Sequence, residues 1–176
     1  MFYFCKQKTN HKNPAMMKKV LLLFVALLAT TLMAQAQMPA VTLNDIDGNA
    51  VRTDTLAHPG HPVIVSFFAT WCKPCQRELS AIAEVYDDWQ EETGVEVVAV
   101  SIDEAQSANR VKPLVAANGW PYRVLLDPNG ELKRALGIQL IPYVVVLDEN
   151  GKMIYKHNGY TDGAENELLE VLTKKL

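Results

Sequence analysis

The feature that most constrains this chain is an apolar run that leads directly into two closely spaced cysteines. The run Val63–Phe68 contains a single polar residue, as is typical of a strand buried on both faces. Cys72 and Cys75 follow it, where a helical pattern begins. A cysteine at a helix N-terminus has its thiolate stabilised by free backbone N–H groups and by the helix dipole. Because the thiolate is the form that attacks disulfides, this arrangement predicts redox chemistry.

The first 36 residues have the pattern of an export signal. Two lysines precede the apolar residues 20–34, a stretch too short to span a bilayer comfortably. The small-x-small pattern Ala34-Gln35-Ala36 predicts cleavage after Ala36. We therefore expect 1–36 to be an upstream extension plus a secretory signal peptide, with translation starting at Met16 or Met17. Residues 37–176 would then form one periplasmic or exported domain.

Removal of this segment changes both the charge and the cysteine count. The whole chain has 17 Lys and Arg against 20 Asp and Glu, and three cysteines. Five of the basic residues and Cys5 lie in 1–36, so 12 basic and 20 acidic residues remain, with Cys72 and Cys75. An acidic domain of this kind carries no basic footprint for nucleic acid. Its two cysteines can pair only with each other or with a partner protein.

Apolar runs that predict strands alternate with helical patterns along the rest of the chain. After an N-terminal hairpin of 41–43 with 50–51, the expected strands are 63–68, 95–102, 122–126, 143–147 and 153–156. The expected helices are one that starts at the cysteines and ends at Gly94, then 105–118, 131–136 and 165–174. This order predicts an α/β fold with a mixed sheet that is covered on both faces. The cysteines would lie at the carboxyl end of its central strand.

Two motifs resemble the thioredoxin superfamily and, more narrowly, its exported TlpA/ResA-like branch. They are Phe67-Phe68-Ala69-Thr70-Trp71-Cys72-Lys73-Pro74-Cys75 and, downstream, Gly137-Ile138-Gln139-Leu140-Ile141-Pro142. The similarity runs from about Val41 to the C-terminus. It implies the thioredoxin fold, with a central mixed β-sheet flanked by helices, an N-terminal β-hairpin extension and a helix/strand insertion.

The resemblance also implies a role for individual residues. Cys72 corresponds to the nucleophile that forms a mixed disulfide with the substrate, and Cys75 to the more buried thiol that resolves it. Pro142 corresponds to the cis-proline of the family, and the backbone of Ile141 to an extended edge that binds a substrate peptide. Trp71 is expected either to contact the substrate or simply to pack against its loop.

The proton-handling group is expected to differ from that of thioredoxins proper. They carry a buried aspartate on the strand before the cysteines, where this chain has Ser66, which cannot act as a base. The TlpA/ResA-like branch often has a glutamate three residues after the second cysteine, and Glu78 stands there. Cys75 and Glu78 would share one helix face, so Glu78 is predicted to handle the proton of Cys75. The alternative is an ordinary solvated glutamate.

These features and the resemblance predict a protein-disulfide oxidoreductase that works without a metal or an organic cofactor. The family favours a monomeric reductant in the cell envelope, recharged by a membrane thiol-transfer reductase and serving cytochrome c maturation. Lys73 and Pro74 lie between the cysteines and are expected to tune the redox potential. Lys73 argues for the opposite direction, because a cation there stabilises the reduced thiolate form. The alternative is a purely solvent-facing charge.

Other functions of the cysteine pair stay open at this point. Two histidines among His58, His61 and His157 could complete a tetrahedral zinc site, and the pair could also be a purely structural disulfide. A thiol peroxidase of this fold would need a threonine three residues before its reactive cysteine, whereas Thr70 lies two before. A metal-binding chaperone of related fold usually has three residues between its cysteines, whereas this chain has two.

Overall fold

The computed structural model describes residues 37–57 and 60–174. The expected signal peptide and His58 therefore lie outside the described residues. The strands are β1 (Thr42–Asp45), β2 (Ala50–Arg52), β3 (Val63–Phe68), β4 (Glu96–Ser101), β5 (Arg123–Leu126), β6 (Tyr143–Leu147) and β7 (Met153–Asn158). The helices are α2 (Lys73–Thr93), α3 (Val111–Asn118), α4 (Glu131–Ala135) and α5 (Glu165–Lys174), with short 3₁₀ turns η1 (Thr53–Thr55) and η2 (Ala108–Arg110).

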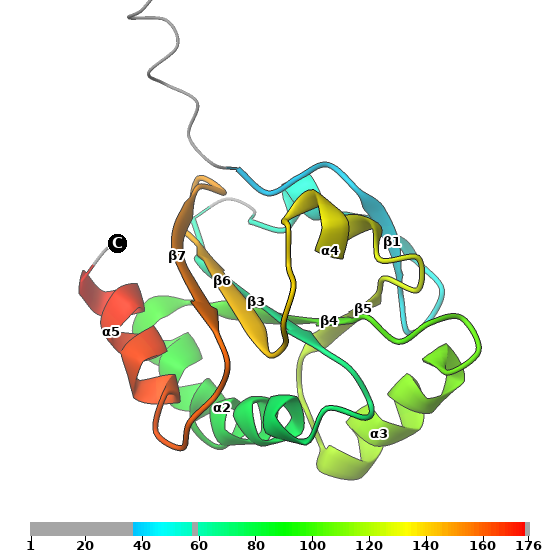
Figure 1. Ribbon diagram of the computed structural model, residues 1–176. Helices are drawn as coiled ribbons and strands as arrows, with labels where there is room; N and C mark the ends of the chain where they lie inside the picture. Colours follow the sequence, from blue (N-terminus) through cyan, green and yellow to red (C-terminus); the bar gives the residue numbers. More distant parts are fainter. Residues whose placement is uncertain (1–36, 58–59, 175–176) are drawn as a thin grey trace, which may run out of the picture. The chain divides into compact units, whose positions relative to one another are not determined.

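The strands form one mixed sheet in the order β2-β1-β5-β4-β3-β6-β7 (Figure 1). The strand before the cysteines, β3, pairs parallel with β4 on one side and antiparallel with β6 on the other. All six of its residues are buried, as its apolar sequence predicted. The expected α/β fold, a mixed sheet with an N-terminal hairpin of β1 and β2, is confirmed.

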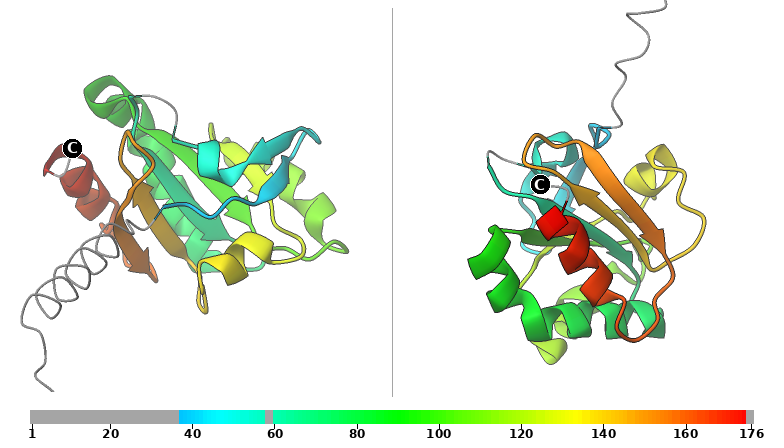
Figure 2. Two further views of the ribbon diagram at one scale, coloured as in Figure 1. Left: turned by 90° about the horizontal axis from the view of Figure 1, so that it is seen from above. Right: turned by 90° about the vertical axis from the view of Figure 1, so that its left-hand side faces the viewer.

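Helices cover both faces of this sheet. Helices α2, α3 and α5 pack on one face, against side chains such as Ile64 and Phe68 of β3. Figure 2 shows α5 running beside α2 on this face, where the two helices are neighbours. On the other face, Val65 and Phe67 pack in a second cluster with Leu132 of α4. Alternate residues of β3 therefore face two separate halves of the core.

Helix α2 runs from the cysteines to the glycine that was expected to end it. Gly94 has φ of 69°, a left-handed conformation that favours glycine. A Cβ at this position would lie 2.7 Å from Nδ1 of His61. The close approach of His61 adds a second, steric reason for glycine here.

One expected helix is shorter than the sequence analysis proposed. The expected helix 105–118 is a turn over its first residues, then η2, and α3 begins only at Val111. Pro113 explains the difference, because proline has no N–H and its ring clashes with the carbonyl four residues earlier. It is tolerated in the first turn of a helix, where α3 places it. Strand β7, in contrast, extends two residues beyond the expected 153–156.

The N-terminal end of the described domain lies beside the last hairpin of the sheet. Gln37 forms an isolated antiparallel bridge with Lys152, which precedes β7. In the part of the chain that the structure describes, no helix is long and apolar enough to cross a membrane.

Candidate active site

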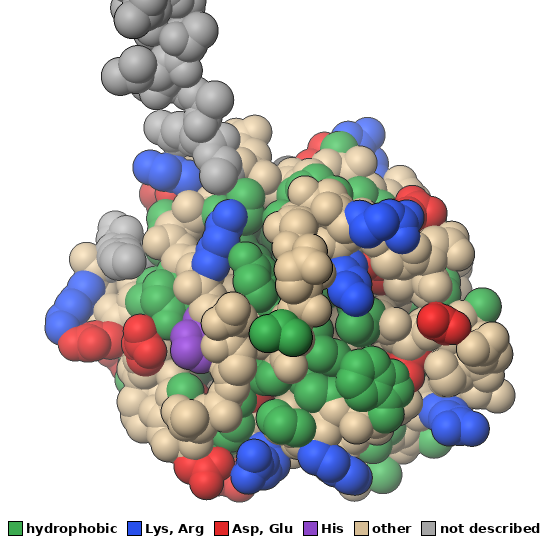
Figure 3. All heavy atoms as spheres, viewed as in Figure 1, with side chains coloured by type: hydrophobic (Ala, Val, Ile, Leu, Met, Phe, Trp, Pro, Cys, Tyr) green, Lys and Arg blue, Asp and Glu red, His purple; other side chains and the backbone are tan. Residues whose placement is uncertain are grey.

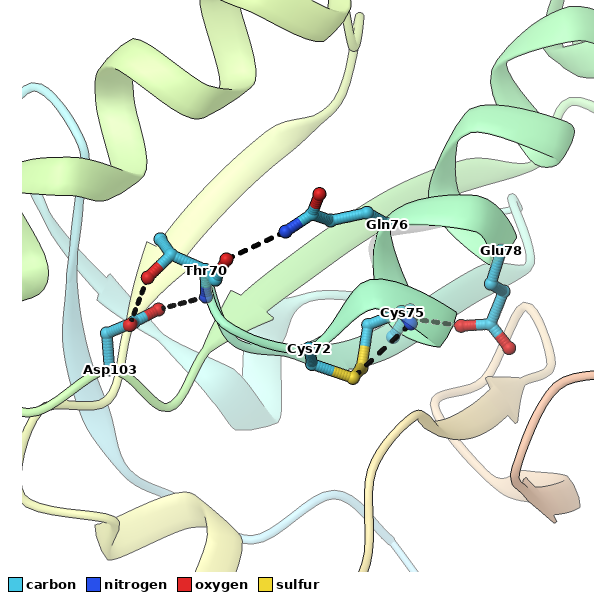
Figure 4. Close-up of a disulfide and its surroundings, with 7 residues drawn as sticks. Thr70, Cys72, Cys75, Gln76, Glu78 and Asp103 are labelled. Carbon is cyan, nitrogen blue, oxygen red and sulfur yellow. Dashed lines mark hydrogen bonds between the residues drawn. A yellow bond between two sulfur atoms is a disulfide. The ribbon is translucent and has the colours of Figure 1, made fainter.

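The two cysteines are joined by a disulfide at the start of α2 (Figure 4). Cys72 is the residue that caps the helix, and its Sγ accepts a hydrogen bond from the N–H of Cys75 at 3.3 Å. Cys72 is 6% exposed, whereas Cys75 is fully buried. Cys72 is therefore the more accessible of the two cysteines.

Two residues of the expected cis-proline loop lie at the start of β6, next to β3. The Ile141–Pro142 peptide bond is cis, as expected. Ile141 is partly buried and packs against the core cluster that contains both cysteines. Within residues 37–57 and 60–174, no backbone hydrogen bond occupies the N–H or C=O of Ile141. These two groups are free to pair with another extended chain.

The surface around this loop is apolar. Trp71 is 67% exposed and Leu140 is 70% exposed, and these are the large hydrophobic side chains with high exposure in the described residues. Figure 3 shows hydrophobic side chains gathered over the start of α2 and the loop before β6. Trp71 was expected from the sequence, whereas Leu140 was not. Its position two residues before the predicted cis-proline was the available signal.

Glu78 is buried in the first turns of α2 and is 3% exposed, so it is not a solvated surface glutamate. Its Oε2 accepts a hydrogen bond from Oγ of Ser66 at 2.8 Å. Burial raises the pKa of Glu78 from its ordinary 4.5 to about 7, although the Ser66 hydrogen bond lowers it in part. Ser66, which the sequence analysis considered only as a missing base, therefore holds the carboxyl group in place.

The residues between the cysteines face solvent. Lys73 is exposed, and its Nζ lies 3.4 Å from Oε1 of Gln76. Pro74 is exposed in the first turn of α2, a position where its missing N–H leaves no helical hydrogen bond unmade. Lys73 thus carries a charge in water rather than one aimed at a buried sulfur.

A second buried carboxylate, which the sequence analysis missed, holds the loop before Cys72. Asp103 accepts hydrogen bonds from the N–H of Thr70 at 2.8 Å and from its hydroxyl at 2.6 Å (Figure 4). The carbonyl of Thr70 in turn accepts from Nε2 of Gln76 at 2.7 Å. Thr70 is therefore fixed at all of its polar atoms.

No group of three or more His, Cys, Asp or Glu side chains is arranged to hold a metal ion within 37–57 and 60–174. A hollow of about 190 Å³ lies between β1 and the turn after β5, and neither cysteine lines it.

Proteins of similar sequence include thiol-disulfide oxidoreductases. The AhpC/TSA family matches residues 34–156. Thiol-disulfide oxidoreductase ResA of Bacillus thuringiensis subsp. konkukian is 30% identical over 138 residues, which cover 78% of this chain and 76% of that protein. ResA of Geobacillus thermodenitrificans is also 30% identical, over 146 residues, covering 76% and 80% of the two chains.

Solved structures of similar proteins share the fold. An uncharacterized thioredoxin-like protein from Porphyromonas gingivalis is 57% identical with a TM-score of 0.71, over 80% of this chain and 92% of that one. StoA from Bacillus subtilis is 25% identical with a TM-score of 0.60, over 78% of this chain and 98% of that one.

Proposed function

Because the chain belongs to the AhpC/TSA family and is a thiol–disulfide oxidoreductase of thioredoxin fold, we propose that it reduces disulfides of protein partners in the cell envelope. Cys72 acts as the nucleophile and Cys75 as the resolving thiol. The difference in exposure between the two cysteines supports this assignment, since Cys75 is fully buried and Cys72 is not.

The reaction proceeds in two exchanges. The Cys72 thiolate attacks one sulfur of the substrate disulfide, a mixed disulfide forms, and the other substrate sulfur leaves as a thiolate that takes up a proton. Cys75 then loses its proton and attacks Sγ of Cys72, which forms the Cys72–Cys75 disulfide and releases the second substrate thiolate. Two electrons pass from the dithiol to the substrate.

Glu78 handles the proton of Cys75 in the second exchange. The two residues lie on one face of α2, three positions apart, and both are buried. A carboxyl group with a pKa of about 7 can both accept and return a proton near neutral pH. Glu78→Gln should leave mixed-disulfide formation little changed and slow its resolution by roughly 10- to 1,000-fold.

The burial of the Glu78 carboxyl group is the observation that supports a reductant, which passes electrons to its substrate, over an oxidant. A negative charge near Cys75 disfavours a thiolate there, and a pair whose reduced form is less stabilised is a stronger reductant. Lys73 would act in the opposite sense, but its charge is exposed and screened by solvent. We therefore expect Glu78 to affect the redox potential more than Lys73 does.

Protein substrates fit the surface better than small thiols do. An extended chain can pair with the free backbone groups of Ile141 beside Pro142, and its apolar side chains can contact Trp71 and Leu140. The export signal pattern of 1–36 supports an envelope location, with recharging by a membrane thiol-transfer reductase. Cytochrome c maturation is the process that the family resemblance favours.

Equilibration with glutathione and dithiothreitol couples tests the direction. The potential should lie nearer that of thioredoxin, about −270 mV, than that of the oxidant DsbA, about −120 mV. Glu78→Gln should make it less negative. A wild-type potential near −120 mV would mean that the protein is an oxidant.

Partner capture and a peroxidase assay test the remaining parts. Cys75→Ser should trap mixed disulfides with envelope proteins in cells, because the resolving thiol is gone. Trapped cytoplasmic proteins would contradict the envelope location. Rapid peroxide consumption with a thiol donor would instead favour a peroxidase.

A further inference from the structure

The loop between β3 and α2 is held by a carboxylate whose hydrogen bonds go to Thr70 and Ser101. Asp103 lies just after β4, the parallel neighbour of β3, and is 1% exposed. Oγ of Ser101 donates a hydrogen bond to Oδ2 of Asp103 at 2.8 Å and accepts one from its N–H at 3.1 Å. This closed pair of hydrogen bonds fixes the direction of the carboxylate.

Both carboxylate oxygens of Asp103 accept hydrogen bonds from Thr70. Oδ2 accepts from the N–H and Oδ1 from the hydroxyl, while the Thr70 carbonyl accepts from Gln76. Asp103 forms no ion pair with any cation among residues 37–57 and 60–174. Its interactions are hydrogen bonds from Thr70 and Ser101, so its contribution is geometric.

Trp71 and Cys72 follow Thr70 directly, and little else fixes the indole. Two thirds of the Trp71 side chain is exposed, so packing does little to orient it. Its backbone is held on one side by Thr70 and on the other by the turn in which the N–H of Cys72 donates to the carbonyl of Ala69 at 3.0 Å. Loss of the Thr70 anchor would release the residue that faces the substrate.

We infer that Asp103 is a positioning residue, which holds Trp71 and Cys72 in the geometry needed for attack on protein disulfides. The inference rests on disulfide exchange at Cys72 but not on the direction of that exchange. In the first exchange the Cys72 sulfur must approach the substrate disulfide in line while the peptide rests on Trp71. A displacement of about 1 Å in such a geometry can slow a reaction roughly 100-fold.

The test compares two disulfides and two buried carboxylates. Asp103→Asn keeps the size but removes the negative charge and one acceptor oxygen, so it weakens the hydrogen bonds that hold Thr70. We expect mixed-disulfide formation with a cystine-containing peptide to slow about 10- to 100-fold. Exchange with a small aromatic disulfide should change far less, because that reagent needs no contact with Trp71.

Asp127→Asn is the matched control. Asp127 is also 1% exposed. It accepts hydrogen bonds from the backbone N–H groups of Glu131 at 2.6 Å and Lys133 at 2.9 Å, so it holds the turn before α4 and not the loop before Cys72. It should lower stability without changing the ratio of peptide to small-disulfide rates. If it changes this ratio as Asp103→Asn does, positioning by Asp103 is refuted.

Thr70 variants test the same contact if Asp103→Asn fails to fold. Thr70→Val removes the hydroxyl that donates to Asp103 and should lower the peptide rate, while Thr70→Ser keeps the hydroxyl and should restore it. Equal peptide rates for the wild type, Asp103→Asn and Thr70→Val would overturn the inference. A wild-type protein that exchanges neither disulfide would instead overturn the proposed function.

Discussion

Replacement of Glu78 by glutamine should change how the stability of the protein depends on pH. The carboxyl group is buried, and its hydrogen-bond partner is the uncharged hydroxyl of Ser66. Burial raises the pKa of Glu78 in the folded protein to about 7, whereas in the unfolded chain it has the ordinary value of 4.5. The folded state therefore holds this proton more tightly than the unfolded state.

The sign and size of the effect follow from proton linkage. Below pH 4.5 the group is protonated in both states, and the full stability is present. Between pH 4.5 and 7 only the unfolded chain ionises, so stability falls by about 1.4 kcal/mol for each pH unit. The loss totals about 3 kcal/mol and is complete above pH 7. Glutamine stays neutral and still accepts the Ser66 hydrogen bond, so Glu78→Gln should escape this loss.

Urea unfolding of the oxidised proteins between pH 4 and 8 measures the difference. The two proteins should be similar near pH 4, and Glu78→Gln should be more stable by about 2–3 kcal/mol at pH 8. Glu84→Gln, which changes an exposed glutamate of the same helix, is the control and should follow the wild type. Parallel pH profiles for the wild type and Glu78→Gln would refute the raised pKa.

Three further results are expected. Pulsed alkylation of the reduced protein, read by mass spectrometry, should label Cys72 before Cys75, which is fully buried; equal labelling would contradict the assigned roles. Trp71→Ala and Leu140→Ala should each slow exchange with a peptide disulfide by about 5- to 30-fold, as loss of an apolar contact of 1–2 kcal/mol would do; unchanged rates in stopped-flow fluorescence would place substrate binding elsewhere. Gly94→Ala should lower the urea unfolding free energy by about 1–3 kcal/mol because φ is 69° there; an unchanged midpoint would show that the helix end relaxes.

The fold was largely predictable because its signals are local. The observed bounds of β3 and α5 agree with those predicted from the apolar run Val63–Phe68 and the periodic pattern of Glu165–Lys174. The start of α3 was misplaced although the sequence contained the reason, since Pro113 restricts where that helix can begin. Helical periodicity alone placed the start of this helix too early, at residue 105.

The site was predictable only where its parts are close in sequence. Cys75 and Glu78 are three residues apart, so a helix brings them to one face. Thr70 and Asp103 are 33 residues apart, and their contact depends on the pairing of β3 with β4. Polar residues at the carboxyl end of the next parallel strand were the available signal.

The hydrogen bond between Ser66 and Glu78 has a consequence for how the sheet is assembled. Because β3 is apolar on both faces, sliding it by one residue would exchange one buried apolar face for another at little hydrophobic penalty. Such a slip would turn Ser66 away from α2 and leave the carboxyl group of Glu78 buried without its donor, at a cost of about 1–3 kcal/mol. The hydrogen bond between Ser66 and Glu78 thus stabilises the native register of β3 over the register shifted by one residue.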